Sequence, residues 1–129
     1  MYRWIFFLVT EIEQPLWRIA RHTFLYPEEK RLPQDIDLAR QECVEMVAVL
    51  ERHMKEREFM VAGRVSVADF NAAYTLDWAN EEKMLDNTPR LREYLKSMYA
   101  RPTAPPTIAE AFAAMGSQAV VTDDVVVTG

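Results

Sequence analysis

Ser66 and Asp69, a hydroxyl and a carboxylate three residues apart, are the pair in this sequence whose types and spacing most suggest chemistry. A serine nucleophile needs a base held against its hydroxyl. The spacing instead matches a capping box, in which the Ser66 hydroxyl accepts from the Asp69 amide and the Asp69 carboxylate accepts from the Ser66 amide. Val65 and Phe70 have the spacing of a hydrophobic staple around the same cap. The pattern therefore favours a structural role for Asp69, at the start of a helix that begins at Val67.

The other reactive side chains are isolated from one another. Cys43 is the only cysteine, so an intrachain disulfide and a thiolate metal site are both excluded. His22 and His53 lie on different predicted helices, with no carboxylate or second histidine at ligand spacing. Glu11 and Glu13 point to different faces of a helix. We therefore predict no catalytic residue and no metal site in this chain.

Composition and charge limit the class of protein. With 129 residues, half of them hydrophobic, the chain is expected to form one globular, water-soluble domain. A formal charge of −5 argues against nucleic acid as a partner. The apolar run at residues 4–9 is shorter than a signal peptide or the roughly 20 residues of a membrane span. The sequence thus predicts a cytoplasmic protein without a membrane partner.

Apolar residues at helical spacing predict five helices and an all-α fold. The expected helices cover about 2–24, 34–57, 67–82, 88–100 and 107–115. The first begins with side chains that are apolar on every face, and Pro15 predicts a kink near residues 12–14. The helix over 67–82 has Phe70, Ala73 and Tyr74 on one side. Its small residues Ala68, Ala72 and Ala73 let neighbouring helices approach closely, so it is the best candidate for a central, buried helix.

The last segment, residues 117–129, does not fit this helical domain of residues 1–116. Its valines have strand propensity but no partner strand in the chain. It is either a disordered end or a strand that pairs with another molecule, and the pattern favours disorder.

Several spaced motifs together resemble the C-terminal all-helical domain of the glutathione S-transferase superfamily, most closely the bacterial type. They are the segment Phe59-Met60-Val61-Ala62-Gly63-Arg64-Val65-Ser66-Val67-Ala68-Asp69-Phe70, then Trp78, the segment Pro89-Arg90-Leu91-Arg92-Glu93-Tyr94-Leu95, and Arg101-Pro102. The resemblance covers residues 2 to 115 and implies a five-helix bundle. In this family the aspartate of the capping box is structural, as the spacing also indicates.

The resemblance implies a function that depends on a second domain. In the family a thioredoxin-like domain binds the co-substrate glutathione and supplies the Ser, Tyr or Cys that activates its thiol, and this chain does not include that domain. By position, Trp4, Leu8 and Phe112 are the candidates for the wall of the electrophile pocket, although each could equally be a core or interface side chain. We expect the helical half of a glutathione S-transferase-like protein that needs no cofactor of its own and is not catalytic as an isolated chain. The alternative is a non-catalytic interaction or scaffold module with the same fold.

The apolar first helix also predicts association. With Trp4, Ile5, Phe6, Phe7, Leu8 and Val9 spread around the helix, we expect an apolar surface too large for a soluble monomer. The predicted partners are a second copy of the chain, docked through this helix, or a thioredoxin-like domain on another chain.

Overall fold

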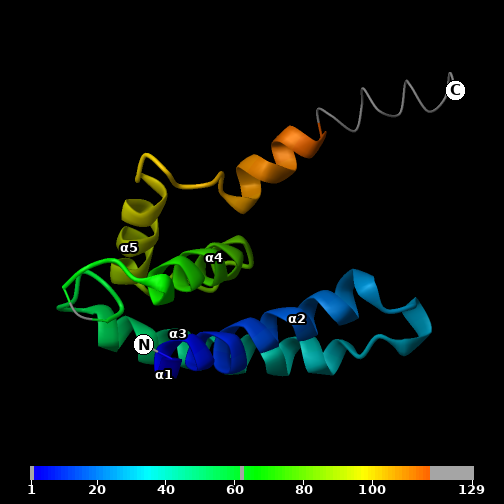
Figure 1. Ribbon diagram of the computed structural model, residues 1–129. Coiled ribbons are helices and arrows are strands. Elements are labelled where there is room, and N and C mark those ends of the chain that lie inside the picture. Colours follow the sequence, from blue (N-terminus) through cyan, green and yellow to red (C-terminus); the bar gives the residue numbers. More distant parts are fainter. Residues whose placement is uncertain (1, 62, 117–129) are drawn as a thin grey trace, which may run out of the picture.

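All regular structure in residues 2–61 and 63–116, the part that the computed structural model describes, is helical (Figure 1). One continuous run of four segments, which we call the first helix, comprises α1 (Tyr2–Phe7), η1 (Leu8–Glu13), α2 (Gln14–Ala20) and η2 (Arg21–Leu25). A short turn, η3 (Glu28–Lys30), leads to α3 (Pro33–Met54), which is followed by α4 (Val67–Glu81), α5 (Pro89–Tyr99) and a helix over 108–116. The all-α fold and the five predicted helices are confirmed.

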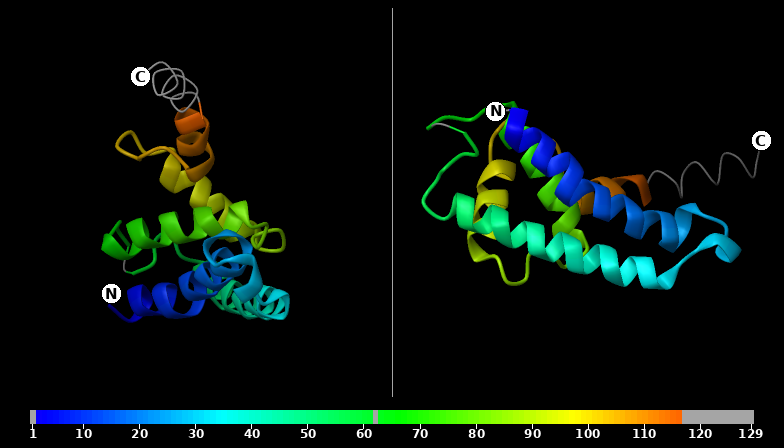
Figure 2. Two further views of the ribbon diagram at one scale, coloured as in Figure 1. Left: turned by 90° about the vertical axis from the view of Figure 1, so that its right-hand side faces the viewer. Right: turned by 90° about the horizontal axis from the view of Figure 1, so that it is seen from below.

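The first helix and α3 form a long antiparallel hairpin, and the later helices pack on one side of it (Figures 1 and 2). In this arrangement α4 contacts α1, η1 and α5, while α5 also reaches α3. The helix over 108–116 extends away from the hairpin beyond α5 (Figure 1). This architecture leaves one side of α4 facing the segment that joins α5 to the last helix.

Pro15 is accommodated by a wider helical turn. Proline removes an amide hydrogen, and its ring crowds the carbonyl one turn earlier. The six residues of η1, directly before α2, are π-helical, and a wider turn relieves that crowding. The Thr10 hydroxyl in this segment donates to the Phe6 carbonyl at 2.7 Å, a bond that competes with the regular backbone ladder. Where a kink was expected, the structure therefore has a π-helical segment.

A single hydrophobic core lies among the first helix, α3, α4 and α5. Its fully buried members include Leu8, Ile12, Leu16, Ala39, Cys43, Val47, Leu50, Met54, Ala68, Ala72, Leu76, Leu85 and Leu91. Burial raises the pKa of the Cys43 thiol to about 12, so this cysteine behaves as a small apolar side chain and is not a reactive thiolate.

The rest of the domain covers one side of the apolar start of the first helix. Leu8 is fully buried, and Trp4, Ile5 and Phe7 are partly buried against the core. The Trp4 ring also stacks on His53 of α3, with centroids 3.8 Å apart. Only the outward stripe of this apolar run, Phe6 and Val9 together with the neighbouring Tyr2, stays exposed. The other side chains of the run are covered by α3 and α4, which pack against the first helix.

The central position of α4 depends on its small side chains. Ala68, Ala72 and Ala79 are fully buried and let α4 approach its neighbours closely. The aromatic side predicted for this helix is turned outward, with Phe70 56% and Tyr74 52% exposed. The central helix was thus correctly predicted, and it packs in the core through Ala68 and Ala72, two of the small residues expected to allow close approach.

Arg18 joins the two arms of the hairpin. Its guanidinium donates to both carboxylate oxygens of Asp35, at 2.5 and 3.3 Å, and to Glu42. Hydrogen bonds from Arg18 hold the pKa of Asp35 below its ordinary value. His22 is engaged at both nitrogens, Nε2 lying 2.9 Å from Asp35 and Nδ1 accepting the Leu32 amide at 3.1 Å. This histidine therefore has no free nitrogen with which to act as a base.

No helix in the described part of the chain has both the length and the apolar character that crossing a membrane requires. The predicted tail at 117–129 lies outside the described residues.

Candidate functional site

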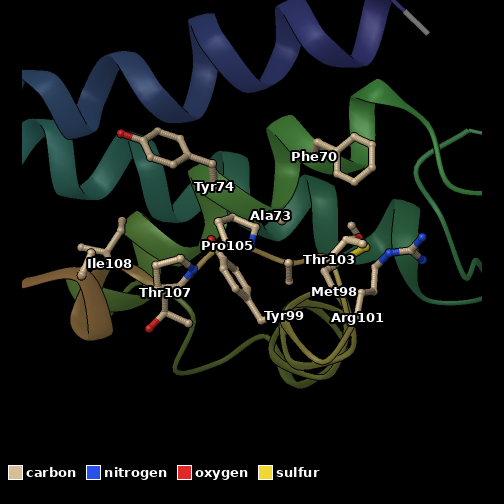
Figure 3. Close-up of a pocket in the computed structure, with 13 residues that line it drawn as sticks. Phe70, Ala73, Tyr74, Met98, Tyr99, Arg101, Thr103, Pro105, Thr107 and Ile108 are labelled. Carbon is tan, nitrogen blue, oxygen red and sulfur yellow. The ribbon is translucent and has the colours of Figure 1, made fainter. Parts of the chain in front are cut away.

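A hollow with a mostly apolar lining lies where α4, the end of α5 and the segment 101–111 meet (Figure 3). Its volume is about 480 Å³, within the range of about 300–1,000 Å³ of small-molecule sites. It is lined by Phe70, Ala73, Tyr74, Met98, Tyr99, Arg101, Thr103, Ala104, Pro105, Pro106, Thr107, Ile108 and Ala111. We call this hollow the α4–α5 pocket.

The α4 wall is formed by residues at helical spacing. Phe70, Ala73 and Tyr74 share the outer side of the helix, opposite the alanine face that packs in the core. The small Ala73 side chain leaves space between the two rings, and Figure 3 shows Phe70 at one end of the pocket and Tyr74 at the other. The helix α4 thus has apolar side chains on two sides, with small ones packed in the core and aromatic rings at the pocket.

The opposite wall is a proline-rich segment that follows α5. Proline fixes its own φ and restricts the residue before it, so the run Ala104-Pro105-Pro106 holds an extended path without regular structure. Thr107 and Glu110 then form a second capping box, with N···O distances of 3.2 and 3.3 Å, that starts the last helix. This places Pro105 and Ile108 across the pocket from α4 (Figure 3).

Asp77 anchors this wall to α4. Its carboxylate is buried and accepts the Ile108 amide at 2.7 Å. The pKa of the neighbouring Tyr99 hydroxyl is raised to about 12, first by burial and then by the negative charge of Asp77. Asp77, which does not itself line the pocket, therefore ties the start of the last helix to α4.

Arg101 lies at the other end of the pocket, beside Met98 and Thr103 and on the same side as Phe70 (Figure 3). The residue is half-buried, and its guanidinium has no ion pair or hydrogen bond among the residues that the structure describes. An arginine side chain has five N–H donors and is always charged. The pocket is therefore apolar over most of its wall, with one unpaired cation at its edge.

The structure does not bring the three predicted pocket residues together. Leu8 is fully buried in the core, and Trp4 packs between Phe7 and His53. Phe112 is 67% exposed on the last helix, next to the pocket residue Ala111. None of the three lines the α4–α5 pocket, so a part in binding an electrophile stays a prediction for each of them.

The predicted capping box is present at the start of α4, and its aspartate does more than cap the helix. Asp69 is fully buried and accepts the Ser66 amide at 2.8 Å and the Ser66 hydroxyl at 3.2 Å. It also accepts the Met60 amide at 2.9 Å and the Tyr94 hydroxyl at 2.6 Å. One carboxylate thus joins the loop before α4, the start of α4 and the middle of α5. Val65 packs against the core while Phe70 lines the pocket, and the staple between them stays a prediction.

The side chains that could activate a thiol are occupied or buried. The Tyr94 hydroxyl is bonded to Asp69, and burial, followed by this bond, raises its pKa. Ser66 is part of the capping box, and the Cys43 thiol is in the core. Tyr74 lines the pocket, but no residue that the structure describes forms a hydrogen bond that would position its hydroxyl for such a role. Within residues 2–61 and 63–116, no group of three or more His, Cys, Asp or Glu could hold a metal ion.

The sequence did not predict the pocket residues that lie at the end of α5 and in the segment 101–111. The spacing Thr107-Ile108-Ala109-Glu110 is itself a capping-box signal and could have fixed the start of the last helix. The Arg101-Pro102 pair served only as one of the motifs of the family resemblance. Nothing in the local pattern indicates that Arg101 lies beside Phe70, because the two are 31 positions apart and meet only through the packing of α5 on α4.

Comparison with known protein families gives one match. The family model described as "Glutathione S-transferase, C-terminal domain" matches residues 12–102. These residues include the end of η1, all of α2, α3, α4 and α5, the capping box and the α4 wall of the pocket. No curated protein matches the chain.

Proposed function

Because the chain belongs to the family of glutathione S-transferase C-terminal domains, we propose that it is the half of a glutathione S-transferase-like protein that holds the electrophile. The observation that supports this proposal is the α4–α5 pocket, whose size and mostly apolar lining suit a small organic molecule. The binding residues are then Phe70, Ala73, Tyr74 and Pro105, in place of the three residues expected from the sequence.

We further propose that this chain does not activate glutathione by itself. Activation requires a hydroxyl, thiol or cation that stabilises the thiolate next to the bound electrophile. Of the described candidates, Tyr94 and Ser66 are held by Asp69, and Cys43 is buried. In the family this chemistry comes from a thioredoxin-like domain, and such a domain is the expected partner.

The purified chain should therefore give no glutathione conjugation above the uncatalysed rate with a chlorinated nitrobenzene as the electrophile. The reason is that the pocket supplies an apolar surface but no group placed to form the thiolate. The measurement is absorbance of the conjugate over a range of protein concentrations, with a heat-denatured sample as the control.

A rate that rises in proportion to the concentration of the chain would contradict this proposal. Tyr74→Phe is the matched variant, because it removes the hydroxyl of this pocket residue while keeping the ring. If conjugation is observed and this variant abolishes it, the chain activates thiols through Tyr74.

The non-catalytic interaction module is kept as a second candidate because of one observation. Val67, Phe70 and Tyr74 form an exposed stripe along α4, each more than half exposed. Such a stripe suits the docking of another protein domain. Association of two copies through the first helix stays a prediction. Phe6 and Val9 of its apolar run are exposed, together with the neighbouring Tyr2.

A further inference from the structure

His22 is a buried residue of η2, close to the turn of the hairpin that the first helix forms with α3 (Figure 2). Its Nδ1 accepts the backbone amide of Leu32 at 3.1 Å, and its Nε2 lies 2.9 Å from a carboxylate oxygen of Asp35. A backbone N–H can only donate, so Nδ1 carries no hydrogen in this arrangement. The hydrogen of the neutral ring is therefore on Nε2, where it donates to Asp35.

The bond from Leu32 ties the turn of the hairpin to the first helix. Residues 27–32, which we call the turn loop, contain η3 and join the first helix to α3. The Leu32 amide bond reaches from this loop into the hairpin, whereas the Arg31 guanidinium donates only to the Tyr26 carbonyl, directly after η2, at 2.9 Å. Leu32 is also the residue directly before α3, so its position sets the path of the chain into that helix.

The charged groups around His22 can accept a positive ring. Asp35 of α3 is paired with Arg18 of α2, which also donates to Glu42 of α3. These side chains bring one positive and two negative charges, so a positive His22 makes the group neutral. The Tyr26 ring, which packs on His22 with centroids 5.3 Å apart, is uncharged. Among the described residues, the other charged side chains at this end of the hairpin form no ion pair with the group: Arg21, Glu28, Glu29, Lys30, Arg31 and Asp37.

We propose that His22 is a pH-sensitive latch on the turn loop, closed when Nδ1 accepts the Leu32 amide and open when Nδ1 is protonated. A protonated Nδ1 directs an N–H at the Leu32 N–H, and two donors form no bond, whereas Nε2 keeps its bond to Asp35 in both states. The open state therefore binds one proton more than the closed state, so its population rises as the pH falls. Acid releases the turn loop and leaves the two arms of the hairpin paired.

Amide hydrogen exchange of the full chain, compared with an unstructured peptide at the same pH, measures the opening. Between about pH 8 and about pH 5, where histidine takes up a proton, the protection of the Leu32 amide should fall about tenfold, as for the loss of one hydrogen bond. The amide of Val47, in the buried middle of α3, should keep its protection. NMR of the ring nitrogens at about pH 8 should show a hydrogen on Nε2 of His22 and none on Nδ1.

Two substitutions each keep the role of one ring nitrogen. His22→Asn places an uncharged acceptor close to the position of Nδ1, so the Leu32 amide should stay protected at both pH values. His22→Gln reaches toward Asp35 but offers no acceptor near Nδ1, so the same amide should be unprotected at both. His53→Gln is the matched control, because it removes the other histidine of the chain, on α3. Its Leu32 amide should respond to pH as in the unchanged protein.

Three results would overturn this inference. The first is a Leu32 amide of the unchanged protein whose protection is the same at both pH values. The second is a hydrogen on Nδ1 of His22 at about pH 8. The third is an equal loss of protection throughout α3, which would show general unfolding in acid instead of a local opening. If circular dichroism shows that a His22 variant is unfolded, the unchanged protein and His53→Gln still decide between these results and the latch.

Discussion

Replacing Asp69 with alanine should lower the free energy of unfolding by about 3–5 kcal/mol, because it leaves several buried donors without an acceptor. Asp69 is fully buried and accepts from Met60, Ser66 and Tyr94. Loss of the helix cap alone would cost about 1–2 kcal/mol. The rest of the loss in stability comes from the buried amide and hydroxyl groups that no longer have an acceptor. Urea denaturation followed by circular dichroism measures the change.

Two further variants test whether the loss of stability comes from the hydrogen bonds that Asp69 accepts. Tyr94→Phe removes one donor and keeps the acceptor, so it should cost only about 1 kcal/mol. Asp86→Ala removes an exposed carboxylate and should change stability by less than about 0.5 kcal/mol. If Asp69→Ala is no less stable than Asp86→Ala, the carboxylate does not hold α4 and α5 together.

Replacing Leu8 with alanine should have the second largest effect, a loss of about 2–5 kcal/mol of stability. Leu8 is fully buried in the core between the first helix and its neighbours, so the change leaves a cavity that the packed helices cannot close. The same denaturation measurement applies. Affinity of the folded protein for 1-naphthaleneacetamide, a flat and mostly apolar probe of the α4–α5 pocket, should be unchanged, because Leu8 does not line this pocket.

Phe112→Ala is the matched control for this prediction. Both residues were candidates for the electrophile pocket, but Phe112 is 67% exposed, so its removal should alter stability by less than about 0.5 kcal/mol. Weaker binding of the probe to a folded Leu8→Ala protein would show that the ligand lies against the first helix, contrary to the structure.

The features that local sequence determines were predicted well. The helix starts at Val67 and Pro89 follow from the Ser66 cap and from a proline in the first turn. The long helix was expected over 34–57 and spans Pro33–Met54. Each capping signal lies within one helical turn of the helix start that it predicts. It therefore does not depend on which helices pack together.

The features that depend on packing were not predictable from the pattern. The role of Asp69 as a cap could be read from Ser66, three residues away, but its bond to Tyr94 crosses 25 positions. The exposure of Phe70 and Tyr74 also reverses the usual rule that aromatic residues mark the buried face. On α4 the alanines are buried, because close approach of helices favours small side chains, and the rings are left to line the pocket.

The measurement that tests the central claim most directly is a map of the amide signals that shift when 1-naphthaleneacetamide and, separately, glutathione are added to the labelled chain. We expect the naphthalene compound to shift the amide signals of residues 70–74 of α4 and 98–111 of the opposite wall. We expect glutathione at millimolar concentration to shift no amide signal of the described residues. Shifts centred on Trp4 and Leu8, or specific shifts with glutathione alone, would contradict this claim.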